Sequence, residues 1–213
     1  MTETRPTKIV CIGRNYAAHA KELGNTVPDR PLLFLKPPSS LIVDGEPVVL
    51  PPDSSRVEHE AEIGLRIGRR ARHVAETEAL AALDAVLPLN DVTARDLQRL
   101  DVQFTRAKGF DSFCPVGRGR ALAGDWRELE IACRVNGTER QHGRAIDMVF
   151  GIPTLIAYIS RVMTLERGDL IATGTPEGVG PLEPGDRVEV ELIGYETVGN
   201  PVVAARAAHE ATA

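Results

Sequence analysis

The segment from Val57 to Ile67 alternates between apolar and charged side chains, and this pattern constrains the fold more than any other feature of the sequence. Apolar residues and His59 fill the odd positions, whereas the even positions carry Glu58, Glu60, Glu62 and Arg66. A period of two residues is typical of a β-strand that buries one face and exposes the other. The sequence therefore predicts a half-buried strand at 57–67, with His59 packed inside the sheet.

Short apolar runs separated by turn residues indicate further strands. The segments with this pattern are 8–13, 32–36, 48–50, 86–91, 129–135, 170–173 and 187–192. Pro88 cannot donate a backbone hydrogen bond, which predicts an edge strand or an irregular strand at 86–91. Helical periodicity and candidate capping residues predict four helices, at 16–23 after Asn15, at 75–85, at 94–100 after Thr93, and at 152–165.

Length and composition limit what the chain can be. A chain of 213 residues buries about 70% of its unfolded surface, which is enough for one sizeable core. We therefore expect a single domain, or two tightly fused halves, over residues 1–213, and the predicted elements indicate the α+β class, mainly β. The net charge of −5 and the 4% of aromatic residues argue against binding to nucleic acid.

The same composition bears on the protein's environment. No apolar run approaches the ~18 residues that a membrane span requires, and residues 1–16 lack the pattern of a signal peptide, so a cytoplasmic location is expected. The three cysteines, Cys11, Cys114 and Cys133, are odd in number and form no CxxC pair. A disulfide framework and a zinc site built from thiolates are therefore not expected.

Carboxylates recur at a spacing that suits a metal ion. Glu60 and Glu62 point to the same side of a strand, about 7 Å apart along the chain. Asp91 follows an apolar run and precedes a predicted helix, where its side chain can turn inward. Three carboxylates leave coordination positions open for substrate and water, which suits Mg²⁺ or Mn²⁺. The alternative is a solvated outer face that binds nothing.

Lysine is scarce in this chain, which makes each lysine informative. Only four of the 25 basic residues are lysines, and one of them, Lys108, lies between Phe104 and Phe110. Its ammonium group could serve as a compact charge beside a substrate oxygen, a task for which arginine is a poor substitute. It could equally reach from an apolar surface into solvent.

Two further features could take part in chemistry. His19 and Glu22 are three residues apart on a predicted helix, so they can form either a histidine–carboxylate pair for proton transfer or a surface ion pair. The segment 170–181, LIATGTPEGVGP, leads a strand into a glycine-rich loop whose backbone N–H groups can bind an anion.

Six segments, in this order, resemble the fumarylacetoacetate hydrolase family over residues 9–203. They are GRNYAAHAKEL, LFLKPPSSL, VEHEAEIGLRIG, LNDVTARDLQ, RAKGFDSFCPVG and IATGTPEGVGPLEPGD. The chain is most similar to the compact single-domain branch, which includes acylpyruvate hydrolases and oxaloacetate decarboxylases. This resemblance implies a rolled, mixed β-sheet fold and a homodimer.

The resemblance also implies roles for nine residues. Glu60, Glu62 and Asp91 match the ligands of Mg²⁺ or Mn²⁺, and Lys108 matches the family's active-site lysine. His19 and Glu22 match a dyad on a short helix that often closes over substrate. Positions that contact the carboxylate or carbonyl groups of substrate are matched by Arg14, Gln98 and Thr175.

The implied reaction is cleavage of a C–C bond next to a 2-oxo acid, through a pyruvate enolate whose charge the metal and Lys108 stabilise. Hydrolysis of an acylpyruvate or fumarylpyruvate and decarboxylation of oxaloacetate both fit, with a small anionic 2-oxo acid as substrate. One alternative is an isomerase or tautomerase of hydroxymuconate-type diacids. Another, from a different class, is a non-catalytic protein that binds metal and carboxylate.

Overall fold

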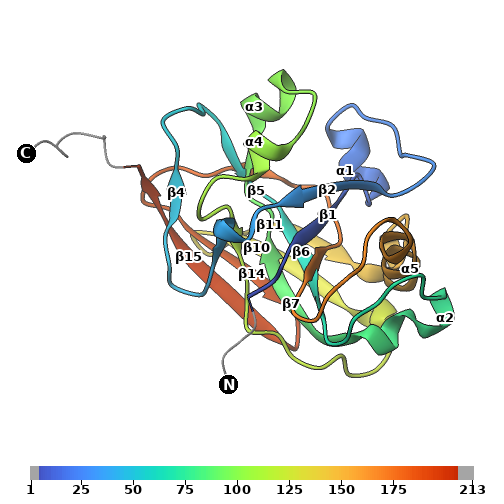
Figure 1. Cartoon of the computed structure of the whole chain (residues 1–213). Coiled ribbons are helices and arrows are strands. Elements are labelled where there is room, and N and C mark those ends of the chain that lie inside the picture. The colour runs from blue at the N-terminus through green and yellow to red at the C-terminus, as the bar shows by residue number, and fades with distance from the viewer. Residues whose placement is uncertain (1–4, 206–213) are drawn as a thin grey trace, which may run out of the picture.

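The computed structural model describes residues 5–205, and two five-stranded sheets dominate it (Figure 1). The first sheet has, in spatial order, β2 (Leu32–Lys36), β1 (Ile9–Gly13), β12 (Leu170–Ala172), β6 (Ala61–Ile67) and β7 (Leu83–Asn90). The second has β11 (Thr138–Arg144), β10 (Glu130–Val135), β14 (Arg187–Leu192), β15 (Glu196–Ala204) and β4 (Val48–Leu50). Each sheet contains one parallel pair, β1 with β12 and β15 with β4, so both are mixed.

Smaller sheets complete the β structure. One contains β13 (Gly180–Pro181), β5 (Val57–His59) and β8 (Thr93–Ala94), and the other pairs β3 (Leu41–Ile42) with β9 (Cys114–Pro115). The α-helices are α1 (Ala17–Glu22), α2 (Glu76–Ala79), α3 (Arg95–Leu100), α4 (Thr105–Lys108) and α5 (Ile152–Val162). Four short 3₁₀ segments lie at Pro38–Ser40, Leu80–Ala82, Trp126–Glu128 and Ala145–Asp147. The predicted α+β class, mainly β, is confirmed.

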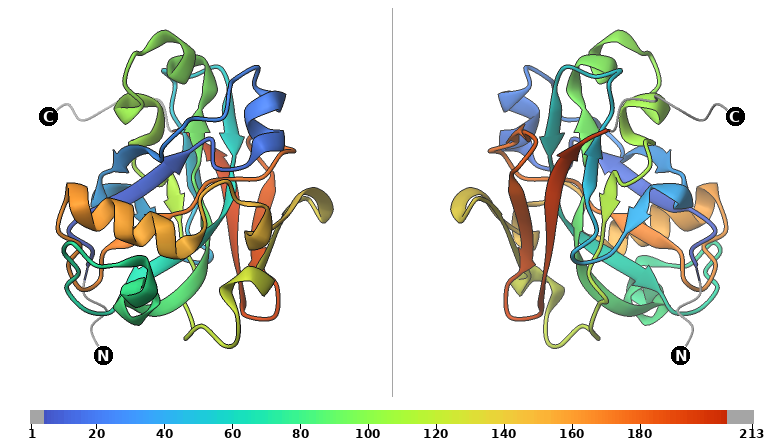
Figure 2. Two further views of the ribbon diagram at one scale, coloured as in Figure 1. Left: turned by 90° about the vertical axis from the view of Figure 1, so that its right-hand side faces the viewer. Right: turned by 90° about the vertical axis from the view of Figure 1, so that its left-hand side faces the viewer.

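The core lies between the two large sheets. Strand β6 packs against β10 and β14, and apolar side chains such as Ile63, Ile131 and Val190 are buried there. Helix α5 lies beside α2 on another side of the molecule (Figure 2). As predicted, α5 begins with a proline in its first turn and buries Ile152, Leu155 and other residues on one face.

The strand predicted at 57–67 is in fact two strands, because the chain leaves one sheet and enters another at Glu60. The prediction of a half-buried strand is also wrong, since Glu58, Glu60 and Glu62 are as buried as the apolar residues between them. Both faces of the chain at 57–63 are therefore covered by other parts of the protein. The prediction for Pro88 is confirmed, because β7 forms the edge of its sheet.

Three predictions about helices are wrong. Helix 75–85 stops early, because the chain joins β7 at Leu83 to pair with Ile67. Asn15 does not cap α1, since its side chain bonds instead to backbone groups of Phe150 and Thr173. Thr93 lies in β8 and does not cap α3.

The described part of the chain contains no helix long and apolar enough to cross a membrane. All three cysteines are buried and unpaired, as expected. Burial raises the pKa of the Cys114 thiol to about 12, so the thiol stays protonated and is a poor nucleophile.

Candidate active site

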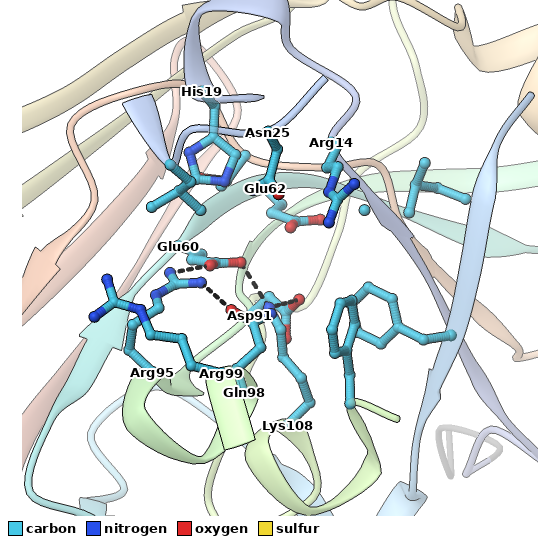
Figure 3. Close-up of a pocket in the computed structure, with 16 residues that line it drawn as sticks. Arg14, His19, Asn25, Glu60, Glu62, Asp91, Arg95, Gln98, Arg99 and Lys108 are labelled. Carbon is cyan, nitrogen blue, oxygen red and sulfur yellow. Dashed lines mark hydrogen bonds and ion pairs between the residues drawn. The ribbon is translucent and has the colours of Figure 1, made fainter. Parts of the chain in front are cut away.

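A cavity of about 240 Å³ opens beside α1, α3 and α4, which gather at the top of the molecule in Figure 1. Eight of the nine residues that the sequence analysis singled out line it. They are Arg14, His19, Glu60, Glu62, Asp91, Gln98, Lys108 and Thr175. The ninth, Glu22, contacts His19. Side chains separated by up to 161 positions in the sequence therefore meet in one place (Figure 3).

Three carboxylates form one side of this cavity. Glu60, Glu62 and Asp91 are all buried, and each offers an oxygen that lies within 4.8 Å of the oxygens from the other two. Glu60 and Glu62 share a direction because they are two residues apart in extended chain. Asp91 joins them because Ala61 pairs with Asn90, and the backbone N–H of Asp91 donates to the carbonyl of Glu60 at 2.8 Å. The alternative of a solvated outer face is wrong.

Buried cations hold two of the three carboxylates. The ammonium nitrogen of Lys108 lies 2.7 Å from Oε2 of Glu60 and 2.7 Å from Oδ2 of Asp91. Lys36 donates to the other oxygen of Asp91 at 2.7 Å, and Arg95 donates to the other oxygen of Glu60. The alternative in which Lys108 reaches into solvent is wrong, because its side chain is only 2% exposed.

Glu62 lacks such a partner. Its carboxylate accepts a backbone hydrogen bond from Gly174 at 2.7 Å, but no cationic side chain in residues 5–205 forms an ion pair with it. Burial raises the pKa of Glu62 well above its ordinary value, and the nearby charge of Asp91 raises it further. Glu60 differs: burial also disfavours its charge, but Lys108 and Arg95 outweigh that effect and lower its pKa.

The ion pairs of the site leave one carboxylate for a bound cation. Lys36, Arg95 and Lys108 pair with Glu60 and Asp91. Glu58 is paired with Arg95 and Arg56. Glu62 is the member of the cluster that forms no ion pair with the side chains in residues 5–205. Three converging carboxylate oxygens are a donor set that suits Mg²⁺ or Mn²⁺. The residues present fit such an ion.

His19 and Glu22 form the expected pair. The Nδ1 atom of His19 lies 3.2 Å from Oε2 of Glu22, and the ring faces the cavity above Glu60 (Figure 3). The other oxygen of Glu22 accepts a hydrogen bond from the backbone of Gly178 at 3.0 Å. His19 is buried and lines the cavity, so the alternative of a surface ion pair is wrong.

Backbone N–H groups of the glycine-rich loop after β12 bind carboxylates, but these belong to side chains of the protein, and binding of an external anion there stays a prediction. The N–H of Gly174 binds Glu62, and the N–H of Gly178 binds Glu22. Gly174 has a positive φ of 98°, and a Cβ atom there would lie 2.7 Å from the Cβ of Asn15. The close approach of these two segments therefore requires glycine.

The three predicted substrate contacts differ in their surroundings. Arg14 adopts a positive φ of 58°, which is unfavourable for arginine and directs its side chain into the cavity (Figure 3). Gln98 accepts a hydrogen bond from Arg95. Thr175 donates its hydroxyl proton to the carbonyl of Ala61 at 2.8 Å. Contact of these residues with a substrate stays a prediction.

Lys36 and Arg95, which hold the carboxylates, were not predicted from the sequence as site residues. The scarcity of lysine could have pointed to Lys36 as it did to Lys108. Arg95 is one of 21 arginines, and nothing in its spacing marks it. Phe34 was not predicted either. Its ring lies 5.1 Å from the ammonium nitrogen of Lys108 and packs edge-on against Phe104.

Comparison with known proteins identifies the family. Residues 8–203 match the family model described as fumarylacetoacetate (FAA) hydrolase C-terminal. An Arabidopsis thaliana protein named oxaloacetate tautomerase FAHD1, mitochondrial, is 45% identical over 198 residues, which cover 90% of this chain and 89% of that protein. A Dictyostelium discoideum protein named oxaloacetate decarboxylase, mitochondrial, is 42% identical, with 89% and 90% covered.

A solved structure agrees with the sequence comparisons. The crystal structure of a 5-carboxymethyl-2-hydroxymuconate delta-isomerase from Mycobacterium smegmatis superposes with a TM-score of 0.88 at 42% identity. The match covers 95% of this chain and 80% of that chain. With nearly the whole chain matched in sequence and in fold, this protein belongs to the fumarylacetoacetate hydrolase family.

Proposed function

We propose that this protein is a divalent-metal-dependent enzyme that forms the enolate of a 2-oxo acid, with decarboxylation of oxaloacetate as its reaction. The observation that carries the proposal is the convergence of Glu60, Glu62 and Asp91 beside Lys108 in one cavity. The names of the Dictyostelium and Arabidopsis relatives support oxaloacetate as the substrate.

The metal would be held by the same three carboxylates. When bound, a divalent cation supplies positive charge that orients the carboxylate and 2-oxo oxygens of the substrate and withdraws electrons from the 2-oxo carbon. Glu62, which forms no ion pair with the side chains of residues 5–205, gains most from such an ion. We propose Mg²⁺ or Mn²⁺ for this role.

The side chains then divide the remaining work. Lys108 is a fixed ammonium charge beside two carboxylates, placed to stabilise the negative charge that develops on the 2-oxo oxygen. Phe34 shields that charge from water on one side. Arg14 forms no ion pair with the side chains in residues 5–205 and lines the cavity, so it is free to bind a substrate carboxylate.

Proton transfer falls to His19. Loss of CO₂ from oxaloacetate leaves the electron pair on C3, and His19 in its protonated form supplies the proton that completes pyruvate. Glu22 orients the imidazole and stabilises its positive charge through the 3.2 Å contact at Nδ1. Hydrolysis of an acylpyruvate would use the same groups, with His19 taking a proton from water.

Tautomerisation or isomerisation is the second candidate, and the His19–Glu22 pair favours it. Decarboxylation needs no base to begin, whereas enolisation requires a base that removes a proton from C3. A buried histidine held by a carboxylate at the cavity is such a base. The names of the Arabidopsis relative and of the Mycobacterium smegmatis isomerase support this candidate.

An NMR time course with oxaloacetate separates the two reactions. The protein is supplied with Mg²⁺ or Mn²⁺, and the blanks are metal without protein and protein with EDTA. Release of pyruvate above both blanks supports decarboxylation, whereas faster exchange between the enol and keto forms without pyruvate supports tautomerisation. Failure to act on oxaloacetate, acylpyruvates or hydroxymuconate-type diacids contradicts the proposal, and tight oxalate binding would then indicate a non-catalytic protein.

A further inference from the structure

Ala61 is the residue that separates Glu60 from Glu62, and side chains hold both of its backbone polar groups. Its N–H donates to Oε1 of Gln141 at 3.0 Å, and its carbonyl accepts the hydroxyl proton of Thr175 at 2.8 Å. The first bond fixes the peptide unit between Glu60 and Ala61. The second fixes the peptide unit between Ala61 and Glu62.

Side chains bind the backbone of Ala61 because the neighbouring strand β12 ends before it reaches the position opposite Ala61. Strand β12 pairs with β6 only as far as Ala172, opposite Gly64. If that register continued, position 175 would lie opposite position 61. The chain turns away after β12, however, and the hydroxyl of Thr175 replaces the missing backbone partner of Ala61. The chain just before Ala61 forms β5, which belongs to the small sheet with β13 and β8.

Both the oxygen and the nitrogen of the Gln141 side-chain amide form hydrogen bonds around Ala61. It comes from β11 in the second sheet, and it is 1% exposed. Its oxygen accepts from Ala61 and contacts Nδ1 of His59 at 2.9 Å, while its nitrogen donates to the hydroxyl of Thr175 at 2.8 Å and to the carbonyl of Pro176 at 2.9 Å. An amide has two donors and two acceptor positions, so all four are used.

These bonds close a ring that runs from Ala61 through Gln141 and Thr175 back to Ala61. We infer that Gln141 and Thr175 are positioning residues, a clamp that fixes the direction and spacing of the Glu60 and Glu62 carboxylates for a divalent cation. The inference rests on the proposed function for the cation, but the clamp itself is a property of the protein alone. It assigns the Thr175 hydroxyl to Ala61 and not to a substrate.

Mn²⁺ affinity, followed by the EPR signal of free Mn²⁺, tests the clamp. Thr175→Val removes the hydroxyl with little change of shape, Thr175→Ser keeps it, and Gln141→Met removes the amide. We expect about 10–100-fold weaker Mn²⁺ binding for Thr175→Val and Gln141→Met, as for other residues that orient metal ligands. Thr175→Ser should restore affinity to within about threefold of the wild type, well inside that range.

The chain offers a matched control in Thr173. It is fully buried, and its hydroxyl donates to the carbonyl of Ile63 at 2.8 Å, which is the same kind of bond just beyond Glu62. Thr173→Val should lower thermal stability as much as Thr175→Val but leave Mn²⁺ affinity near the wild-type value. If both valine variants bind Mn²⁺ as the wild type does, the clamp is wrong. Lost turnover with unchanged affinity in Thr175→Val would instead make Thr175 a substrate contact.

Amide hydrogen exchange in the metal-free protein separates this inference from the proposed function. If the wild type binds no Mn²⁺, the proposed function fails, but the clamp still predicts faster exchange at Ala61 in Gln141→Met than in Thr173→Val. Equal exchange at Ala61 in the two variants would overturn the clamp whatever the outcome with metal.

Discussion

The ammonium nitrogen of Lys36 lies 2.7 Å from Oδ1 of Asp91, and neither side chain is exposed to solvent. The second oxygen of Asp91 is bound to Lys108, so two lysines compensate one carboxylate inside the protein. Lys36 also donates to the carbonyl of Val92 at 3.1 Å, which ties β2 to the turn that presents Asp91. The candidate metal site is thus part of the charge balance of the core.

Replacing Lys36 with methionine should therefore destabilise the metal-free protein strongly. Removing one partner of a buried ion pair typically costs about 3–5 kcal/mol, and the remaining bond to Lys108 puts this case near the lower value. Saturating Mn²⁺ should recover part of the loss, because a bound cation compensates Asp91. Urea unfolding with and without Mn²⁺ measures both effects.

Lys8→Met is the matched control for that experiment. Lys8 pairs with the buried carboxylate of Asp169 at 2.5 Å, and neither residue lines the cavity. Its replacement should also destabilise the protein, but Mn²⁺ should recover none of the loss beyond its effect on the wild type. Equal recovery in the two variants would show that Lys36 is unrelated to the metal site.

Glu62→Gln should have the opposite effect on the metal-free protein. Burial raises the pKa of Glu62, and no cationic side chain in the described part of the chain pairs with it. Replacing its charge should therefore increase the free energy of unfolding by about 1–2 kcal/mol. Glu58→Gln should decrease it, since Arg95 and Arg56 outweigh burial and lower the pKa of Glu58. Urea unfolding at pH 7 compares the two variants.

Glu62→Gln should also lose the stabilisation by Mn²⁺. At 100 times its Kd, Mn²⁺ should stabilise the wild type by about 2.7 kcal/mol, and Glu62→Gln should be nearly insensitive at that concentration. If Mn²⁺ stabilises Glu62→Gln as much as the wild type, Glu62 is not a ligand.

The sequence was enough to find the cluster because its members carry local signals. Glu60 and Glu62 follow the period of a strand, and Asp91 directly follows the apolar run of another strand. Their burial was not predictable, because alternation is equally typical of a solvated face. The burial of Glu58 and Glu60 depends on Arg95, which comes from another segment of the chain and pairs with both carboxylates.

Residues that reach the site only through tertiary packing left little or no signal in the local sequence. Gln141 lies on a strand whose other residues are mostly exposed and polar, and only the packing of the second sheet against β6 brings it to Ala61. The division of 57–67 between two sheets was equally hidden, since the residue types do not change at Glu60. Long-range pairing decided both features, and local sequence does not encode it.

His19→Asn should lower kcat by about 10²–10⁴-fold, the usual contribution of a positioned acid or base. Its Mn²⁺ affinity should not change, because His19 is not among the carboxylate ligands. Glu22→Gln should lower kcat less, since the imidazole remains in place without its charged partner. Steady-state kinetics with oxaloacetate give both values.

His142→Asn is the control for this pair. His142 forms a similar contact with Glu130 at 3.0 Å, but its side chain is 46% exposed and it lies outside the active-site cavity. Its replacement should leave kcat unchanged. An equal loss of activity in His19→Asn and His142→Asn would argue against proton transfer by His19.

The start of α3 should weaken in acid. Although burial opposes its charge slightly, hydrogen bonds from Ser54 and Ser55 lower the pKa of Asp96 from 3.8 to about 2. A lowered pKa means that the ionised carboxylate stabilises the folded state above pH 3.8, and this contribution disappears as the pH falls through 2. The stability advantage of the wild type over Asp96→Asn should thus shrink between pH 5 and pH 2 in urea unfolding. A constant difference would contradict this assignment.

The most direct test of the whole account is a crystal structure of the protein with Mn²⁺ and oxalate, a stable analogue of the pyruvate enolate. We predict one Mn²⁺ ion, located by its anomalous scattering, that is bonded to oxygens of Glu60, Glu62 and Asp91. Oxalate should bind on the open side of this ion, near Lys108. An anomalous peak elsewhere, or none between these three carboxylates at saturating Mn²⁺, would contradict it.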